Sequence, residues 1–130
     1  MGIILIVLVI AIITFLYFSS INSTITKGTG YELTIGMSQN EVFKRLPNAL
    51  EASGMKDLNT PINVNVYIGV DAPQKQLKVA LKELNYSSLD NASKWVFFID
   101  SNYFFDRLTL EFCDKKLCKI ERYRLYFELP

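Results

Sequence analysis

The chain has 130 residues, half of them hydrophobic, and its 14 basic and 13 acidic side chains leave a net charge of +1. This near balance excludes binding of nucleic acid by bulk charge, which needs a clearly basic surface. The length suits one small domain plus an extra element, and the absence of histidine removes the commonest general base and metal ligand.

Residues 3–18 form an uncharged apolar run, and the first charged side chain in the sequence is Lys27. Together with Ile21 just beyond it, the run reaches the lower limit of about 17 residues for a transmembrane helix. A cleaved signal peptide and a buried core helix are the alternatives, but no basic residue precedes the run and it has no polar face. We therefore favour a transmembrane anchor at residues 1–20 in the cell inner membrane, single-pass, with the C-terminal domain in the periplasm.

Residues 21–32 are rich in Ser, Thr and Gly, which is typical of a flexible linker, and residues 33–130 are expected to form the folded domain. Within "LTIGMSQNEVFKRL" (33–46), Ser38 and Glu41 form a capping box that predicts the start of a helix. Gly36 is expected to provide the backbone angle of the preceding turn, and Pro47 is expected to end the helix.

The stretch "PINVNVYIGV" alternates apolar and polar residues and predicts a half-buried strand over residues 62–70. The following residues, 71–86, predict a second helix that starts near Asp71 or Ala72, with Pro73 in its first turn. Its expected apolar stripe consists of Leu77, Ala80, Leu81 and Leu84. Its lysines are expected to form a solvated face.

The last third of the chain predicts three strands, at residues 94–100, 107–113 and 119–129. Short connections between consecutive strands favour an antiparallel meander. The expected fold is therefore α+β, with about two helices packed on a three- to four-stranded antiparallel sheet behind the transmembrane helix.

The two cysteines, Cys113 and Cys118, lie at the tip of a predicted hairpin. A turn at Lys115 and Lys116 would place the thiols opposite each other, whereas a three-residue loop would improve the charge pairing but send them to opposite faces. A disulfide suits the expected export, and two unpaired cysteines are the alternative. Two cysteines without histidine do not make a zinc site.

Aromatic residues crowd the β region, and the strand "WVFFI" carries apolar groups at positions of both faces. Either both faces are buried within the domain or an aromatic patch is exposed for binding. Basic residues along the last hairpin alternate with acidic ones, which favours a cross-strand charge ladder over an anion site. The candidate partner-binding residues are Trp95, Phe97, Tyr103, Arg122, Arg124 and Tyr126.

Candidate catalytic groups are scarce. Neither a phosphate-binding loop nor a nucleophile elbow is present, and the pairs Asp100 with Asp106 and Asp57 with Asp71 are interpreted as solvated turn residues. We therefore expect no enzyme activity, no cofactor and no metal.

Two short segments resemble the SmpA/OmlA (BamE-like) family. The Gly36-Met37-Ser38 helix start resembles the opening of those domains, and residues 94–120 resemble their Trp-containing strand and closing hairpin. The resemblance implies a small α+β domain of two helices on three strands that acts outside the cytoplasm as a non-catalytic binding module. The chain departs from the family's outer-membrane members in having no lipobox cysteine.

The function expected from these observations is a non-catalytic, membrane-anchored, extracytoplasmic domain that binds another protein. One specific form is an immunity protein that neutralises a toxin. The alternatives are an envelope-assembly or structural membrane subunit and a small-ligand or lipid-binding domain. The expected partners are a protein, either a toxin or an envelope subunit, and the membrane through residues 3–18.

Overall fold

The structure is a computed structural model that describes residues 2–19, 21–55, 57, 59–68, 75–99 and 105–125. Its helices are α1 (Gly2–Ser19) and α2 (Gln39–Ala52), and its two short 3-10 turns are η1 (Leu81–Glu83) and η2 (Tyr86–Ser88). Its strands are β1 (Ile21–Ile25), β2 (Thr29–Gly30), β3 (Leu33–Thr34), β4 (Ile62–Tyr67), β5 (Lys75–Val79), β6 (Lys94–Phe98), β7 (Phe105–Cys113) and β8 (Lys116–Leu125).

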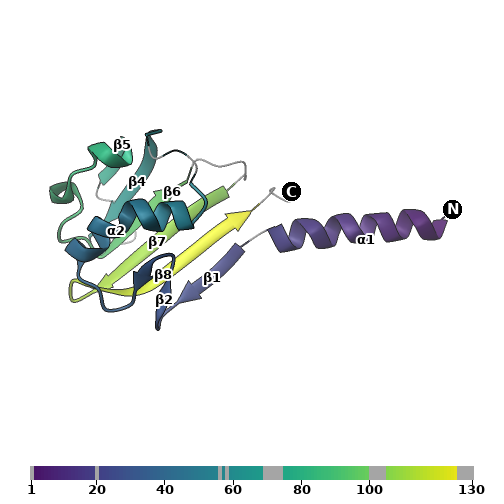
Figure 1. Ribbon diagram of the computed structural model, residues 1–130, viewed down its shortest axis with the longest axis horizontal. Coiled ribbons are helices and arrows are strands. Elements are labelled where there is room, and N and C mark those ends of the chain that lie inside the picture. The colour runs from purple at the N-terminus through teal and green to yellow at the C-terminus, as the bar shows by residue number, and fades with distance from the viewer. Residues whose placement is uncertain are drawn as a thin grey trace.

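Six of the described strands form one antiparallel sheet in the order β1-β8-β7-β6-β4-β5, while β2 and β3 form a separate ribbon. In Figure 1, α2 lies across one face of the sheet and α1 extends away from the domain. The predicted α+β class is confirmed. The prediction of two helices on three to four strands is wrong, because segments expected as a linker and as a helix supply two further strands.

Alternation along the strands gives the sheet two different faces. On the face under α2, called the inner face, Val64, Phe97 and Leu108 are cross-strand neighbours and each is fully buried. Burying such side chains contributes about 1.5–3 kcal/mol each, so this face supplies most of the stability of the domain. The core cluster consists of Leu33, Val42, Leu46, Ala49, Leu50, Met55, Ile62, Val64, Val66, Leu81, Leu84, Leu89, Ala92, Trp95, Phe97, Ile99, Leu108, Leu110, Phe112, Leu117 and Ile120.

The predicted strand at residues 62–70 is confirmed over Ile62–Tyr67, where Ile62, Val64 and Val66 point into the core. Ile68 differs from the prediction, because it lies past the end of the strand and is 44% exposed. Residues 69 and 70 lie outside the described residues.

Helix α2 begins where the capping box predicts. The Oγ atom of Ser38 accepts a hydrogen bond from the backbone N–H of Glu41 at 3.2 Å. Gly36 has a φ of +101°, a left-handed angle that glycine adopts without a steric penalty. The side chain of Gln39 is buried and donates from Nε2 to the carbonyl of Ala92 at 2.6 Å, which ties the helix start to the loop before β6.

The prediction that Pro47 ends this helix is wrong, because α2 continues to Ala52. A proline inside a helix removes one backbone hydrogen bond and costs about 3 kcal/mol. Leu46, Ala49 and Leu50 are fully buried around it, and this packing holds the helix together through the proline.

The predicted second helix over residues 71–86 is wrong in its described part. Residues 75–79 form β5, which pairs with β4 from Ile62↔Val79 to Val66↔Lys75, and the helical turns that follow are only the short η1 and η2. Leu77 and Val79 are half-buried against the core, whereas Lys75 and Lys78 are exposed. The local pattern of this segment fits a helix and a strand, and pairing with the edge of β4 selects the strand.

The segment expected as a flexible linker, residues 21–32, contains β1 and β2. β1 pairs with β8 along its whole length, from Ile21↔Arg124 to Ile25↔Ile120. A Ser/Thr-rich sequence has sufficient strand propensity to cover an edge when a long neighbouring strand offers its hydrogen-bonding groups. The linker prediction is therefore wrong for these residues.

Helix α1 is apolar on all sides, and its described side chains from residues 2–15 are exposed. Among the described residues, no helix is long and apolar enough to cross a membrane, so the predicted transmembrane anchor is wrong. The helix stops at Ser19, and its 18 residues rise about 27 Å, less than a hydrocarbon core of about 30 Å. Ile21, which the sequence seemed to add to the apolar run, belongs to β1 instead.

Candidate functional site

The candidate site is the outer face of the six-stranded sheet, opposite α2 (Figure 1). In the described part of the chain no helix packs on this face. Most of its side chains are polar, but β6 contributes Val96 and Phe98. Cross-strand pairing sorts these side chains into rows perpendicular to the strands, and two rows differ clearly in charge.

Among the rows that run across all six strands, the one nearest α1 on this face is called the proximal row. It begins on β1 at Asn22, three positions after the last residue of α1, and runs across the whole sheet. Its members, in sheet order, are Asn22, Tyr123, Arg107, Phe98, Asn63 and Lys78. The row thus carries two cations, two aromatic rings and no acidic side chain.

The second group lies toward the β7–β8 turn, at the far end of the strands from α1. It is called the distal ladder and consists of Tyr67, Lys94, Glu111, Lys119 and Glu121. Lys119 lies between two carboxylates, with its Nζ atom 2.7 Å from Glu121 Oε1 and 3.3 Å from Glu111 Oε2. The hydrogen bonds to Glu121 and Glu111 raise the pKa of Lys119, so the ammonium form is favoured.

Two cations on the outer face lie over aromatic rings. The Nζ atom of Lys94 is 4.3 Å from the centroid of the Tyr67 ring in the distal ladder. In the proximal row, the guanidinium carbon of Arg107 is 4.9 Å from the centroid of the Tyr123 ring. Both distances are within the range of cation–π attraction, which orients the long side chains while leaving their charges at the surface.

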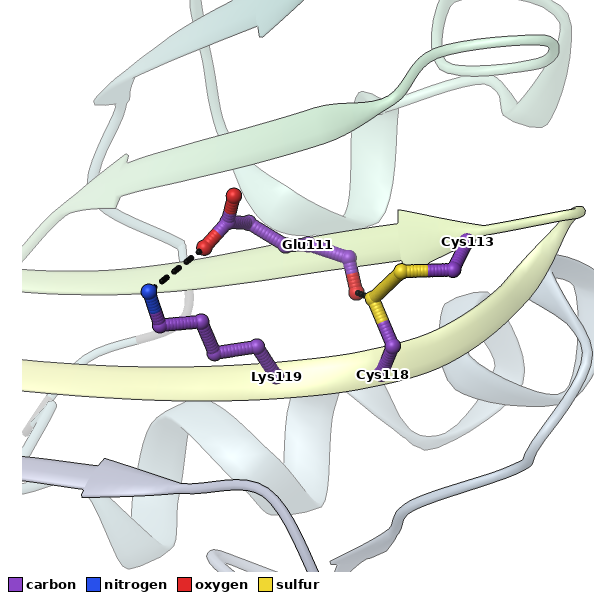
Figure 2. Close-up of a disulfide and its surroundings, with 4 residues drawn as sticks. All are labelled: Glu111, Cys113, Cys118 and Lys119. Atoms are coloured by element: carbon purple, nitrogen blue, oxygen red, sulfur yellow. Dashed lines mark hydrogen bonds and ion pairs between the residues drawn. A yellow bond between two sulfur atoms is a disulfide. The ribbon is translucent and has the colours of Figure 1, made fainter.

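A disulfide between Cys113 and Cys118 lies beside the distal ladder (Figure 2). The predicted bond is confirmed, with Cα atoms 5.7 Å apart, inside the usual range. Figure 2 shows the sulfur of Cys118 next to the carbonyl oxygen of Glu111, at 3.4 Å, and Glu111 reaching across to Lys119. The bond therefore fixes the end of the hairpin directly beside two residues of the ladder.

The hairpin follows one of the two predicted registers along its strands and neither of them at its tip. Leu110↔Ile120 and Glu111↔Lys119 are paired, as the three-residue loop would require, but a bulge then shifts the register. The extra residue in the bulge is Cys118, and this brings both sulfur atoms to one side of the hairpin. The turn itself is formed by residues 114 and 115, whose φ angles of +52° and +65° are those of a two-residue type I′ turn.

Three of the predicted partner-binding residues are buried and cannot form a binding surface. Trp95 and Phe97 are both 0% exposed, and Trp95 donates from Nε1 to the carbonyl of Leu89 at 2.9 Å. Arg122 is 1% exposed on the inner face. The alternative, in which both faces of this strand are buried within the domain, is closer to the structure, because Val96 on the outer side is only 6% exposed.

Arg122 has a structural role instead. Its Nη1 atom forms a buried ion pair with Asp106, and Nη1 also donates to the carbonyls of Arg107 and Tyr123 at 3.1 Å each. Its Nη2 atom donates to the carbonyl of Ser53, the C-terminal cap of α2, at 2.6 Å. A cation at this position satisfies a terminal carbonyl of the helix and complements its dipole.

Of the other three predicted binding residues, the structure describes only Arg124. Arg124 is half-buried and lies opposite Ile21 and Asp106 on the inner side of the sheet. Tyr103 and Tyr126 lie outside the described residues. The four described members of the predicted set therefore do not form an exposed surface.

Sequence reasoning missed the residues that do occupy the outer face, among them Tyr67, Lys94, Phe98, Arg107 and Tyr123. The sequence contained a signal for them. Each is next to a buried residue in its strand, and consecutive strand residues point to opposite faces. Choosing residues by aromatic and basic type alone ignored this alternation.

A shallow hollow of about 420 Å³ lies on the outer face over β4, β5 and the end of β6. Its lining residues are Asn63, Asn65, Gln76, Leu77, Lys78 and Phe98. The amide groups and the one ammonium group of the lining can bind a ligand by hydrogen bonds and charge. These lining residues include no nucleophile paired with a base.

Each of the two acidic pairs considered has one member outside the described residues, so the structure does not test either pair. The interpretation of Asp106 as a solvated turn residue is wrong, because it is buried within β7. Asp106 is held in the ion pair with Arg122, and Asp57 accepts a hydrogen bond from the backbone N–H of Asn59 at 2.9 Å, as in an Asx turn. Asp71 and Asp100 lie outside the described residues. Across the described ranges, no group of three or more His, Cys, Asp or Glu side chains could hold a metal ion.

Comparison with known proteins identifies no relative. No protein-family model matches the chain, and neither the curated proteins nor the solved structures include a match. The resemblance of residues 33–46 and 94–120 to the SmpA/OmlA (BamE-like) family therefore stays a prediction, and the two-helix, three-strand fold that it implied is not the one observed.

Proposed function

We propose that the protein is a non-catalytic binding protein that is held at a lipid membrane by α1 and contacts a protein partner through the distal ladder. The observation that carries the proposal is the exposure of α1. The eleven large apolar side chains between Ile3 and Phe15 that the structure describes as exposed have exposed fractions of 48–78%.

The distribution of these side chains favours lipid as the surrounding medium. Burying a large apolar side chain contributes about 1.5–3 kcal/mol, so leaving eleven in water forfeits on the order of 15–30 kcal/mol. A protein groove would cover one stripe of the helix, whereas α1 is apolar around its whole circumference and has no polar face to leave in water. The acyl chains of one leaflet can cover such a helix on all sides without its crossing the bilayer.

The distal ladder supports the protein-binding part of the proposal. Its charges are held in fixed positions by the pairs of Lys119 and by the stacking of Lys94 on Tyr67. The disulfide and the tight turn fix the hairpin that carries Glu111 and Lys119. A preorganised surface of alternating charge loses little conformational entropy on binding and selects its partner by charge complementarity.

The proposed location is extracytoplasmic. Disulfides persist in oxidising compartments and are rare in the cytosol, so the Cys113–Cys118 bond supports a domain on the outer side of the membrane.

Photo-crosslinking in cells that produce the protein tests the proposal. Tyr67 is replaced by the photoreactive analogue benzoylphenylalanine, a conservative change on the distal ladder, and the same analogue at Lys44, exposed on α2, is the matched control. We expect one discrete protein adduct from position 67 and none from position 44. Adding Lys119→Glu, which places three carboxylates together, is expected to abolish the adduct. Equal adducts from both positions, or an adduct unaffected by Lys119→Glu, would refute a partner on the ladder.

A further inference from the structure

The proximal row contains cations and aromatic rings that are not part of the distal ladder, the surface proposed to contact a protein partner. Lys78 and Arg107 are exposed, and Phe98 and Tyr123 are half-buried beside them. None of the acidic side chains that the structure describes lies in this row, whereas each cation of the distal ladder has a cross-strand carboxylate neighbour.

Chain connectivity limits the distance between α1 and the first residue of this row. The row starts at Asn22, three residues past Ser19, and three extended residues span at most about 11 Å. The row of Glu111 and Lys119 lies four residues further along the strands, or about 14 Å beyond the proximal row. Arg107 lies two strands and Lys78 five strands from β1, or about 10 Å and about 24 Å across the sheet. With a Debye length of about 8 Å at physiological salt, both cations respond to charge at the surface that holds α1 when the strands stand along the membrane normal.

We propose that the proximal row binds the headgroups of anionic lipids. This inference rests on the proposed insertion of α1 into a membrane. Lys78 and Arg107 supply the positive charge that attracts such headgroups, and the guanidinium of Arg107 can form paired hydrogen bonds with a lipid phosphate. Tyr123 supplies an amphipathic ring of the kind that is enriched at the membrane–water interface, and Phe98 supplies an apolar ring in the same row.

The row then aligns the domain on the membrane. A row that crosses the sheet from β1 to β5 contacts the membrane at several points and so fixes the tilt of the sheet. The connection of the domain to α1 after Ser19 is a single point and does not fix this tilt. The β7–β8 turn and the distal ladder are directed away from the lipid, where a protein partner can reach them.

Chemical footprinting of the full chain in vesicles tests this inference. The chain is reconstituted in phosphatidylcholine alone and in phosphatidylcholine with phosphatidylglycerol at about three to one. Lysines are acetylated and arginines are modified with phenylglyoxal, and both are mapped by peptide mass spectrometry. Lys44 and Arg45, both exposed on α2, are internal controls of the same chemical type as Lys78 and Arg107.

We expect the reactivity of Lys78 and Arg107 to fall about fivefold in vesicles that contain phosphatidylglycerol, since one cation near an anionic surface gains about this factor in occupancy. Lys44 and Arg45 should change less than twofold, and the protection should disappear at 1 M salt, where the Debye length is about 3 Å. Equal reactivity in both vesicle types, or protection that persists at high salt, would overturn the headgroup contact. If the chain does not associate with either vesicle type, the proposed insertion of α1 fails first, and with it this inference.

Discussion

Replacing Arg122 by Met is expected to lower the free energy of unfolding by about 3–5 kcal/mol, the usual cost of removing one partner of a buried ion pair. The substitution leaves the carboxylate of Asp106, whose side chain is 2% exposed, without its cation. It also removes the donor to the carbonyl of Ser53, 2.6 Å away, at the end of α2. An unsatisfied buried carbonyl costs about 1–3 kcal/mol by itself, which is part of the same total.

The assay is urea unfolding of the full chain in a non-ionic detergent that covers α1, with the disulfide intact. Trp95 is the single tryptophan of the chain and is fully buried, so its fluorescence reports loss of the core. A second variant separates charge from packing: Arg122→Met combined with Asp106→Leu removes both charges and should recover all but about 1–2 kcal/mol. A loss below about 1 kcal/mol for Arg122→Met alone would refute the role of this residue as the link between β8 and α2.

Four further outcomes are expected in the same unfolding assay. Ser38→Ala should cost about 1 kcal/mol through loss of the cap, and an unchanged midpoint would contradict that role. Pro47→Ala should stabilise the chain by about 1–3 kcal/mol by restoring a helix hydrogen bond, and a loss of stability would show that the proline is required. Reduction of Cys113–Cys118, which closes a short loop, should cost about 2 kcal/mol, measured with and without dithiothreitol; equal midpoints would count against it. Because the pKa of Lys119 is raised above 10.5, the wild type should lose stability as pH rises from that value through the raised pKa, and Lys119→Met should lack this part of the loss.

The start of α2 and the strand β4 could be predicted because their determinants are local. The capping box needs only Ser38 and Glu41, and the core face of β4 is set by alternation within six residues. The continuation of α2 past Pro47 depends instead on burial against the sheet, which is a tertiary effect that overrides the local cost of the proline.

β5 could not be predicted because its pattern fits two structures. Leu77, Ala80, Leu81 and Leu84 have helical spacing, but Leu77 and Val79 also alternate with polar residues as in a strand. The deciding factor is pairing with β4, and the sequence between the two segments does not reveal it. The recruitment of residues 21–25 to the edge of β8 is missed for the same reason.

The candidate site was mispredicted because residue type was used without register. Trp95 and Arg122 have the composition of interface residues, yet both point to the inner face, while Arg107 and Tyr123 in neighbouring positions point outward. The disulfide was predicted correctly from the expected compartment, while the spacing left two registers open. The bulge at Cys118 that permits the bond depends on the packing of two long strands. The more specific hypothesis of a toxin-neutralising immunity protein stays a prediction.

Flotation of the full chain with vesicles tests the central claim most directly, namely that α1 holds the protein in lipid. Phosphatidylcholine vesicles without net charge isolate the apolar contribution, and a variant with Ile6, Val9, Ile10 and Ile13 all replaced by Ser has the same length with a polar stripe on α1. We predict that the wild type floats with the vesicles, remains bound in 1 M salt and is released by detergent, while the variant stays at the bottom of the gradient. A wild-type chain that stays at the bottom, or that 1 M salt releases, would contradict the account.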